Sequence, residues 1–396
     1  MHHTGYLNTM IKLKISLLGQ IAIGIALGIG VGIIAPEWIV RAFNTFNSIF
    51  GEFLGFIIPL IIVGLVVPAI ADIGKKAGKI LIVTVSIAYA STLFAGFASY
   101  FTGVSLFPAM INTDGMVETT TASAAPAPFF TISIPPMMGV MTALVMAFVI
   151  GLCLAGTQNR TLMDAVHGFE EIVTITIRKA IIPLLPLYIF GIFLNMTFVG
   201  EVYSILTVFI KIIGVIFLLH LAVILLQYCI AGAIAKKNPI KMLVNMLPAY
   251  FTALGTQSSA ATIPVTLEQT RKNGVSEDIS GFVIPLCATI HLAGSTLKIV
   301  ACALALMIMQ GMPFDLEMFA GFIFMLGITM VAAPGVPGGA IMASLGVLQS
   351  ILGFDQQAQA LMIALYIAMD SFGTACNVTG DGAIAVIIDK IFIKRQ

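Results

Sequence analysis

The sequence predicts an all-α polytopic membrane protein with eight transmembrane helices and two re-entrant helical hairpins. Of its 396 residues, 59% are hydrophobic and only 9% are charged, whereas a soluble chain carries about 25% charged residues. Apolar runs repeatedly reach the roughly 20 residues that a helix needs to cross a bilayer. Transmembrane strands would be shorter and would alternate in polarity. One integral membrane domain, residues 1–396, is therefore expected in the lipid bilayer.

Charge and cysteine content exclude several other classes of protein. The net charge is +1, which gives no reason to expect a nucleic-acid partner. The five cysteines lie in apolar surroundings and form no CxxC or His/Cys cluster, so neither a zinc site nor a disulfide framework is predicted. The first apolar segment, residues 15–34, is long enough to stay as a span instead of being removed as a signal peptide.

Six full spans are expected before the last third of the chain. Glycines in the first recur mostly at steps of four residues, which permits close contact with a neighbouring helix. Pro59 and Pro68 predict kinks in the second span. Residues 113–128 are polar and low in complexity, so they are expected to form an irregular external segment. The six spans are expected at residues 15–34, 49–70, 80–107, 132–154, 169–198 and 203–235.

Lysine and arginine gather on one side of this arrangement. They lie at both termini and near residues 75–79, 160, 236–241 and 271–272, while the opposite loops carry mainly aspartate and glutamate. Arg41 is the main exception. By the positive-inside rule, both termini are expected in the cytoplasm.

Two segments in the last third break the pattern of simple spans. Residues 241–271 carry basic clusters at both ends, and their centre, 255–262, is small and polar. Residues 314–352 turn at a Pro- and Gly-rich stretch. Non-helical backbone at membrane depth is tolerated when it lines a cavity, and one break from each face points to inverted repeats around a midplane site. The alternative for each is a kinked ordinary span. Between them, residues 279–309 are expected to form the seventh span.

The last apolar segment contains two carboxylates. Between residues 361 and 388 the only charged side chains are Asp370 and Asp381. With Thr374 and Asn377 they follow steps of four, three and four, which places all four on one helical face. Ionisable groups inside a membrane are costly and usually functional, and hard oxygen donors suit small cations and ammonium groups. The alternative is a set of polar residues that join helices to one another.

Four motifs in a fixed order carry a resemblance to a known family. They are the serine pair Ser258–Ser259, the segment 291–295 (His-Leu-Ala-Gly-Ser), the turn 334–339 (Pro-Gly-Val-Pro-Gly-Gly) and 377–381 (Asn-Val-Thr-Gly-Asp). Across residues 241–390 the chain closely resembles the dicarboxylate/amino acid:cation symporters, which include the glutamate transporters and the bacterial serine/threonine symporters.

This resemblance implies a homotrimer with an elevator mechanism in the prokaryotic cytoplasmic membrane. The scaffold would comprise approximately residues 10–72 and 130–200, and the moving transport part approximately 78–107 and 203–390. Ser258 and Ser259 match the family's serine tip, so the resemblance implies that they hold the substrate α-carboxylate. Substrate contacts carried over by position are Gln257, Ser258, Ser259, Ser295, Val336, Gly339, Asp370, Gly373, Thr374 and Asn377. Sodium contacts are Cys287, Thr289, His291, Met330, Val331, Ala333, Asn377 and Asp381.

Departures from the family pattern bear on the substrate. Acidic amino acid carriers have an arginine where this chain has Gly373, so the bidentate partner of a side-chain carboxylate is missing. Asp370, the match to the amine-binding aspartate, argues against dicarboxylates without an amine. A small neutral amino acid such as serine, threonine or alanine is therefore expected. Lys298 leaves an alternative open: it could supply the missing charge for aspartate or glutamate, or it could snorkel to the surface.

The segment around His291 predicts fewer sodium ions than in the acidic carriers. Ala293 replaces the family's aspartate and His291 replaces an asparagine. His291 could coordinate an ion, carry a proton, or be a neutral hydrogen-bonded histidine. The expected activity is sodium-coupled symport, with an uncoupled channel or receptor as a further alternative. An enzyme is not expected, because Ser258 and Ser259 have no nearby histidine or aspartate in sequence, and His220 has no obvious partner.

Overall fold

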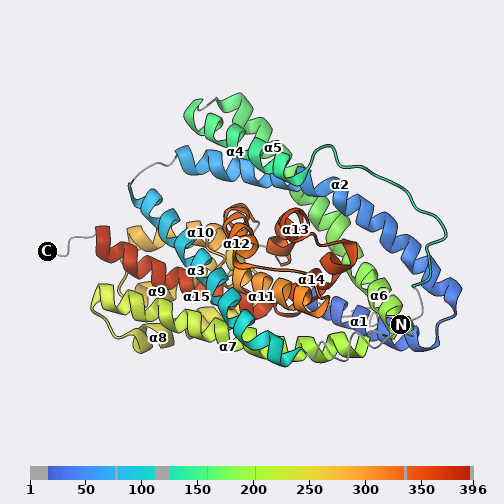
Figure 1. The fold of residues 1–396 in the computed structure, drawn as a ribbon. Helices are drawn as coiled ribbons and strands as arrows, with labels where there is room; N and C mark the ends of the chain where they lie inside the picture. The colour runs from blue at the N-terminus through green and yellow to red at the C-terminus, as the bar shows by residue number, and fades with distance from the viewer. Residues whose placement is uncertain are drawn as a thin grey trace, which may run out of the picture.

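In the computed structural model, all regular secondary structure of the described residues is helical (Figure 1). The structure describes residues 17–75, 79–111, 125–157, 159–200, 202–333 and 337–392. The elements are α1 Leu17–Ile34, α2 Glu37–Lys75, α3 Lys79–Met110, α4 Val140–Thr157, α5 Arg160–Thr176, the π-helical turn η1 Ile177–Ile181, α6 Ile182–Phe198, α7 Val202–Ala235, α8 Pro239–Thr256, α9 Ser259–Lys272, α10 Glu277–Ile290, α11 Ala293–Met309, α12 Leu316–Val331, α13 Gly339–Leu352, α14 Gln356–Ala368 and α15 Asp370–Phe392.

Several helical segments are long and apolar enough to cross a membrane. Among the described residues six meet this condition by length and composition, and four shorter apolar helices accompany them. The six are Glu37–Asp72, Lys79–Met110, Arg160–Phe198, Leu206–Ala235, Glu277–Met309 and Asp370–Phe392. The chain is therefore a multi-pass helical membrane protein.

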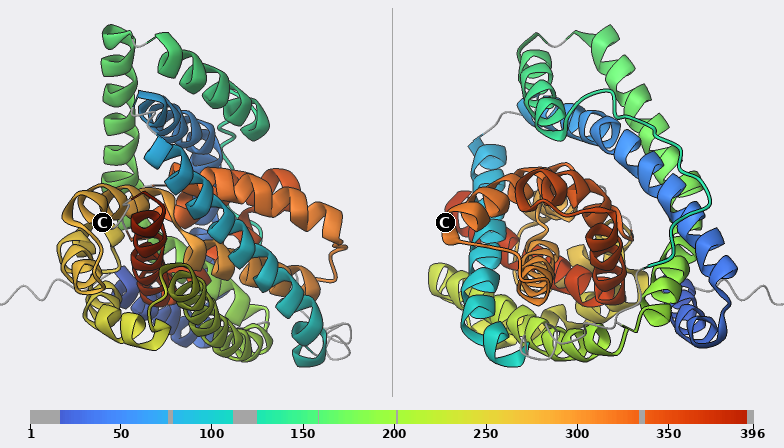
Figure 2. Two further views of the ribbon diagram at one scale, coloured as in Figure 1. Left: turned by 90° about the vertical axis from the view of Figure 1, so that its left-hand side faces the viewer. Right: turned by 45° about the vertical axis from the view of Figure 1, so that its right-hand side comes forward.

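The helices pack in two groups. In the first, α1 packs along α6, and α2 packs against α4, α5 and α6. In the second, α3 packs on α11 and α12, and α15 lies against α7, α8, α9, α10 and α11. Figure 1 and the right-hand view of Figure 2 show α2, α4, α5 and α6 forming an arc beside the cluster of α8 to α15. Fewer contacts join the groups, mainly from α13 and α14 to α1, α2 and α6.

Glycines determine how closely α1 approaches α6. A Cβ atom on Gly24 would lie 2.7 Å from the carbonyl oxygen of Pro186, and one on Gly28 would lie 2.7 Å from that of Phe190. Backbone atoms cannot give way easily, so a larger residue at either position would push the helices apart. The close contact expected from the glycine spacing is confirmed.

Two helices begin at other residues than the predicted spans, and polar side chains of α2 contact the non-helical segment before α4. The second helix begins at Glu37 instead of residue 49, and the fourth begins at Val140 because residues 125–138 are not helical. Asn44 Nδ2 donates to the Pro126 carbonyl oxygen at 2.8 Å. Further along α2, a Glu52 carboxylate oxygen accepts from the backbone N–H of Ile134 at 3.0 Å. A prediction from hydropathy alone leaves the polar start of α2 out of the span. It also places the apolar residues just before α4 in a helix.

The fifth span also begins earlier than expected, at Arg160 instead of residue 169. It runs through α5, the π-helical turn Ile177–Ile181 and α6 without a gap. Pro183 lies in the first turn of α6. Because proline has no N–H, it cannot continue a regular α-helical hydrogen-bond ladder, and the π-helical turn directly precedes it.

The chain breaks at both predicted hairpin tips and at two further places. Gln257 takes a left-handed conformation with φ 53° between α8 and α9, and Gly338 has φ 74° before α13. Residues 279–309 were expected as one span, but His291–Leu292 separates α10 from α11. Met369 separates α14 from α15. None of the residues at these two further breaks is a glycine or proline, so local sequence does not reveal them.

Candidate functional site

The site is built where the starts of α11 and α15 meet. Gly294, in the first turn of α11, lies so close to α15 that a Cβ atom would be 2.6 Å from the carbonyl oxygen of Gly373. The N–H of Gly294 has no partner within its own helix, and it donates to Asn377 Oδ1 at 2.8 Å. Asn377 Nδ2 donates to Ser295 Oγ at 3.2 Å. These contacts fix the two helix starts side by side.

Lys298 and Asp370 form a buried ion pair in this site. Lys298 Nζ lies 2.9 Å from Asp370 Oδ1, and the two side chains are 0% and 4% exposed. The other carboxylate oxygen, Oδ2, accepts from the backbone N–H of Gly338 at 2.9 Å. The suggestion that Lys298 snorkels to the surface is therefore wrong: the carboxylate holds its ammonium group inside the protein.

The end of α14 also stabilises this ammonium group. Lys298 Nζ lies 3.4 Å from the centre of the Tyr366 ring, a cation–π distance. It donates to the carbonyl oxygens of Tyr366 at 3.4 Å and Met369 at 3.5 Å. These carbonyl oxygens also accept from the backbone N–H groups of Met369 and Gly373, and the partial negative charge at the C-terminus of α14 favours a cation there. The carbonyl oxygens around the helix break at Met369 thus add to the contacts of Lys298.

Gly373 provides the space that Lys298 occupies. A Cβ atom on Gly373 would lie 2.9 Å from both Cε and Nζ of Lys298. Family resemblance placed an arginine at position 373 in acidic amino acid carriers. Here a positive charge lies beside that position, but it comes from α11 instead of α15. The sequence could show that the guanidinium group was missing, but not that a lysine fills the space.

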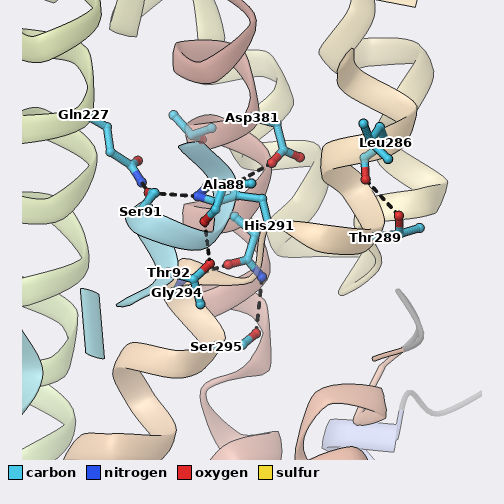
Figure 3. Close-up of polar contacts among 12 residues, drawn as sticks. Ala88, Ser91, Thr92, Gln227, Leu286, Thr289, His291, Gly294, Ser295 and Asp381 are labelled. Atoms are coloured by element: carbon cyan, nitrogen blue, oxygen red, sulfur yellow. Dashed lines mark hydrogen bonds and ion pairs between the residues drawn. The ribbon is translucent and has the colours of Figure 1, made fainter. Parts of the chain in front are cut away.

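A second buried pair lies further along α15 (Figure 3). His291 Nδ1 lies 2.8 Å from Asp381 Oδ1, and both side chains are almost fully buried. His291 Nε2 lies 3.0 Å from Ser91 Oγ on α3, which accepts from Gln227 Nε2 on α7 at 2.9 Å. His291 is thus hydrogen-bonded on both ring nitrogens. Of the three roles considered for it from the sequence, this arrangement fits that of a hydrogen-bonded histidine.

Asp381 has one oxygen available for a cation. Its Oδ2 atom is buried and has no hydrogen-bond partner among the described residues. A buried carboxylate oxygen without a partner is costly, and a small hard cation with oxygen ligands would satisfy it. No cluster of three His, Cys, Asp or Glu side chains occurs in the described part of the chain. Asp381 Oδ2 is thus a hard oxygen donor that a small cation could use.

The remaining predicted substrate residues lie around the two helix starts. Gln257 Nε2 donates to Ser371 Oγ at 2.9 Å, so the α8–α9 tip contacts the first turn of α15. Ser295 Oγ lies 3.0 Å from the Tyr366 hydroxyl. Ser258 Oγ caps α9 by accepting from Ala261 N at 3.3 Å. Ser259, Gly339 and Thr374 are buried, and Val336 lies outside the described residues.

The predicted sodium residues fall into two places. Cys287 and His291 lie near Asp381, and the Cys287 carbonyl oxygen accepts from the His291 N–H at 2.9 Å. Thr289 is exposed, and its hydroxyl group donates to the Leu286 carbonyl oxygen at 2.8 Å (Figure 3). Of the others, Met330 and Val331 end α12, and Ala333 lies two residues beyond it.

Sequence reasoning missed three polar residues that contact the site from other helices. Ser91 and Gln227 extend the contacts of His291, and His220 Nε2 lies 2.9 Å from the Gly294 carbonyl oxygen. His220 therefore has a partner, contrary to the sequence-based expectation. A signal existed: His220 and Gln227 are seven residues apart in α7, which puts both on one face of an apolar helix.

Replacing Gly380 with alanine is expected to disturb the His291–Asp381 pair. The new Cβ atom would lie 2.6 Å from His291 Cε1 and 2.7 Å from Gln227 Oε1. Overpacking of this kind costs about 1–3 kcal/mol, so the unfolding midpoint should fall. Gly55→Ala is the matched control, because a Cβ atom there meets nothing within 4 Å. Equal behaviour of the two variants in a thermal-shift assay would contradict this packing.

Comparison with known proteins gives the family. The model of the sodium:dicarboxylate symporter family matches residues 17–391. The serine/threonine transporter SstT of Acinetobacter baylyi is 25% identical over 407 residues, covering 96% of this chain and 98% of the relative. SstT proteins from two strains of Acinetobacter baumannii are also 25% identical, over 405 residues, 95% of this chain and 97% of each relative. The resemblance drawn from the four motifs is confirmed: this chain belongs to the sodium:dicarboxylate symporter family.

Proposed function

We propose that this protein couples inward movement of sodium to uptake of a small neutral amino acid, namely serine, threonine or alanine. The observation that carries the proposal is the polar face of α15. Asp370 at its start faces the α13 end of the second hairpin, and Asp381, three turns further on, has a buried oxygen without a partner among the described residues. The names of the relatives, which are serine/threonine transporters, support the same substrate class.

Two separate sites on one helix explain how cation and substrate binding are linked. The substrate amine would bind Asp370 Oδ2 after the Gly338 N–H has left it, and the α-carboxylate would bind at the start of α9 beside Ser258. Sodium would bind Asp381 Oδ2, with Asn377 Oδ1 and nearby carbonyl oxygens as further ligands. Asn377 lies between the carboxylates and contacts α11, so it can respond to both ligands.

The division into two packing groups would allow elevator-type movement, in which one group moves relative to the other. The group of α1, α2, α4, α5 and α6 would form the static scaffold, and α3 with α7 to α15 would carry the substrate across the membrane. In this arrangement α8–α9 and α12–α13 are re-entrant hairpins added to eight spans. The scaffold would form a homotrimer in the cell membrane, with both termini in the cytoplasm.

Uptake of radiolabelled L-serine into proteoliposomes tests the proposed function. An inward sodium gradient should drive accumulation, whereas an equal choline gradient should not. Preloading vesicles with unlabelled serine should accelerate entry of the label, because a carrier exchanges its substrate and a simple channel does not. Uptake that is indifferent to sodium would refute the coupling, and steady currents without saturable exchange would favour a channel.

An acidic amino acid remains a second candidate because of one observation. The Lys298 ammonium group lies beside Gly373 within the site, where it could meet a side-chain carboxylate. Its contacts with Asp370 and the end of α14 are already made, however, so an acidic ligand would have to share it. If unlabelled aspartate competes with serine uptake and Lys298→Ala abolishes that competition, this candidate gains support. If aspartate does not compete, it fails.

A further inference from the structure

The amine-binding carboxylate of the proposed site already carries a cation. Asp370 Oδ1 bonds the Lys298 ammonium group at 2.9 Å and Oδ2 bonds the Gly338 N–H at 2.9 Å. The lysine is fully buried, lies over the Tyr366 ring and has its space provided by Gly373. The Lys298 ammonium group therefore already neutralises the Asp370 carboxylate. An incoming substrate ammonium group would also be repelled by Lys298, because both are positively charged.

The charges around the start of α15 are already balanced without a ligand amine. The positive charge of Lys298 and the negative charge of Asp370 cancel each other. The N-termini of α11, α13 and α15 all lie here, as the bonds of Gly294 N to Asn377 and Gly338 N to Asp370 show. Each helix N-terminus contributes roughly half of a positive elementary charge, and the carbonyl oxygens of Tyr366 and Met369 at the end of α14 contribute partial negative charge. Asp381 is 11 residues along α15, roughly 16 Å away at a rise of 1.5 Å per residue, and it faces His291.

We infer that Lys298 takes the place of the substrate ammonium group, so that the site also accepts short carboxylates that have a hydroxyl group instead of the α-amine. Such a ligand keeps the carboxylate that helix N-termini favour, brings no second ammonium group, and leaves the Lys298–Asp370 pair intact. An amino acid that binds Asp370 Oδ2 has to share the carboxylate with Lys298, and weakening a buried ion pair is unfavourable. The inference rests on the proposed function in that it places substrate beside Asp370.

L-Glycerate is the direct probe, because it is L-serine with a hydroxyl group in place of the ammonium group. Binding of each ligand to the purified full-length protein in sodium buffer is measured by calorimetry. The wild-type dissociation constant for L-glycerate should be within tenfold of that for L-serine, or lower. If L-glycerate binds more than tenfold more weakly than L-serine, the inference is wrong.

Lys298→Met shows whether the lysine sets this preference. Methionine keeps much of the side-chain length but removes the charge, so Asp370 would need the ligand amine. The ratio of L-serine to L-glycerate affinity should rise at least tenfold, and an unchanged ratio would contradict the inference. If this variant does not fold, Gly373→Ala serves instead, because its Cβ atom displaces the ammonium group and should shift the ratio in the same direction.

The two hypotheses fail in different ways in this experiment. L-Serine binding without L-glycerate binding would retain the proposed function and overturn the role of Lys298. L-Glycerate binding without L-serine binding would retain the role of Lys298 and overturn the proposed function. If neither ligand binds the folded wild-type protein, both are wrong.

Discussion

Replacing Asp370 with asparagine is expected to abolish serine uptake and to destabilise the protein by about 3–5 kcal/mol, the usual cost of removing one member of a buried ion pair. The substitution leaves the Lys298 ammonium group fully buried without its carboxylate partner. It also replaces the acceptor of the Gly338 N–H, which joins the second hairpin to α15. Binding and folding should therefore both suffer, as measured by proteoliposome uptake and by the thermal unfolding midpoint.

Two further variants show whether these effects come from the pair. Asp315→Asn is the matched control, since Asp315 caps α12 by accepting from Met318 N at 2.7 Å and asparagine caps helices equally well. It should change neither stability nor uptake appreciably. The double variant Lys298→Met/Asp370→Asn should regain part of the lost stability, because no unpaired charge remains. A double variant less stable than Asp370→Asn alone would show that the two residues do not act as a pair.

Replacing Asp381 with asparagine is expected to abolish sodium dependence. The side chain is 1% exposed, and one of its oxygens has no partner among the described residues. Asparagine keeps the shape but loses the negative charge that a sodium ion needs. Sodium-driven serine uptake should fall at least 100-fold, equivalent to about 2.8 kcal/mol at 1.4 kcal/mol for each factor of ten. Stabilisation of the purified protein by sodium should disappear in the same variant.

Asp389→Asn is the control for this prediction because it lies on the same helix. Asp389 is buried near the end of α15, and its Oδ1 atom accepts from the Ser276 N–H at 2.9 Å, away from the site. This variant should keep its response to sodium, whatever stability it loses with the weakened hydrogen bond to Ser276. If Asp389→Asn and Asp381→Asn lose sodium dependence equally, Asp381 has no special role in cation binding.

The sequence predicts elements whose cause is local. The tips of both predicted hairpins carry glycine, serine or proline, and backbone breaks were found at Gln257–Ser258 and Gly338. The polar face of α15 follows from helical spacing, and the structure places Asp370, Thr374, Asn377 and Asp381 in that single helix. Spacing, charge and turn chemistry are sufficient for such features.

Features that depend on contacts between distant segments were not predictable. The break at His291–Leu292 exists where the next helix start is held by Asn377, 83 residues away. The Lys298–Asp370 pair requires α11 and α15 to face each other at the right rotation, which no single segment specifies. The sequence raised Lys298 as an alternative source of positive charge but could not choose between a buried and a snorkelling side chain.

The most direct test of the account is L-serine affinity measured over a series of sodium concentrations, with choline replacing sodium to hold ionic strength constant. If sodium strengthens serine binding, serine must strengthen sodium binding by the same factor. The account predicts that serine binds progressively more tightly as sodium rises, until the cation site saturates. Serine affinity that is the same in sodium and in choline would contradict it.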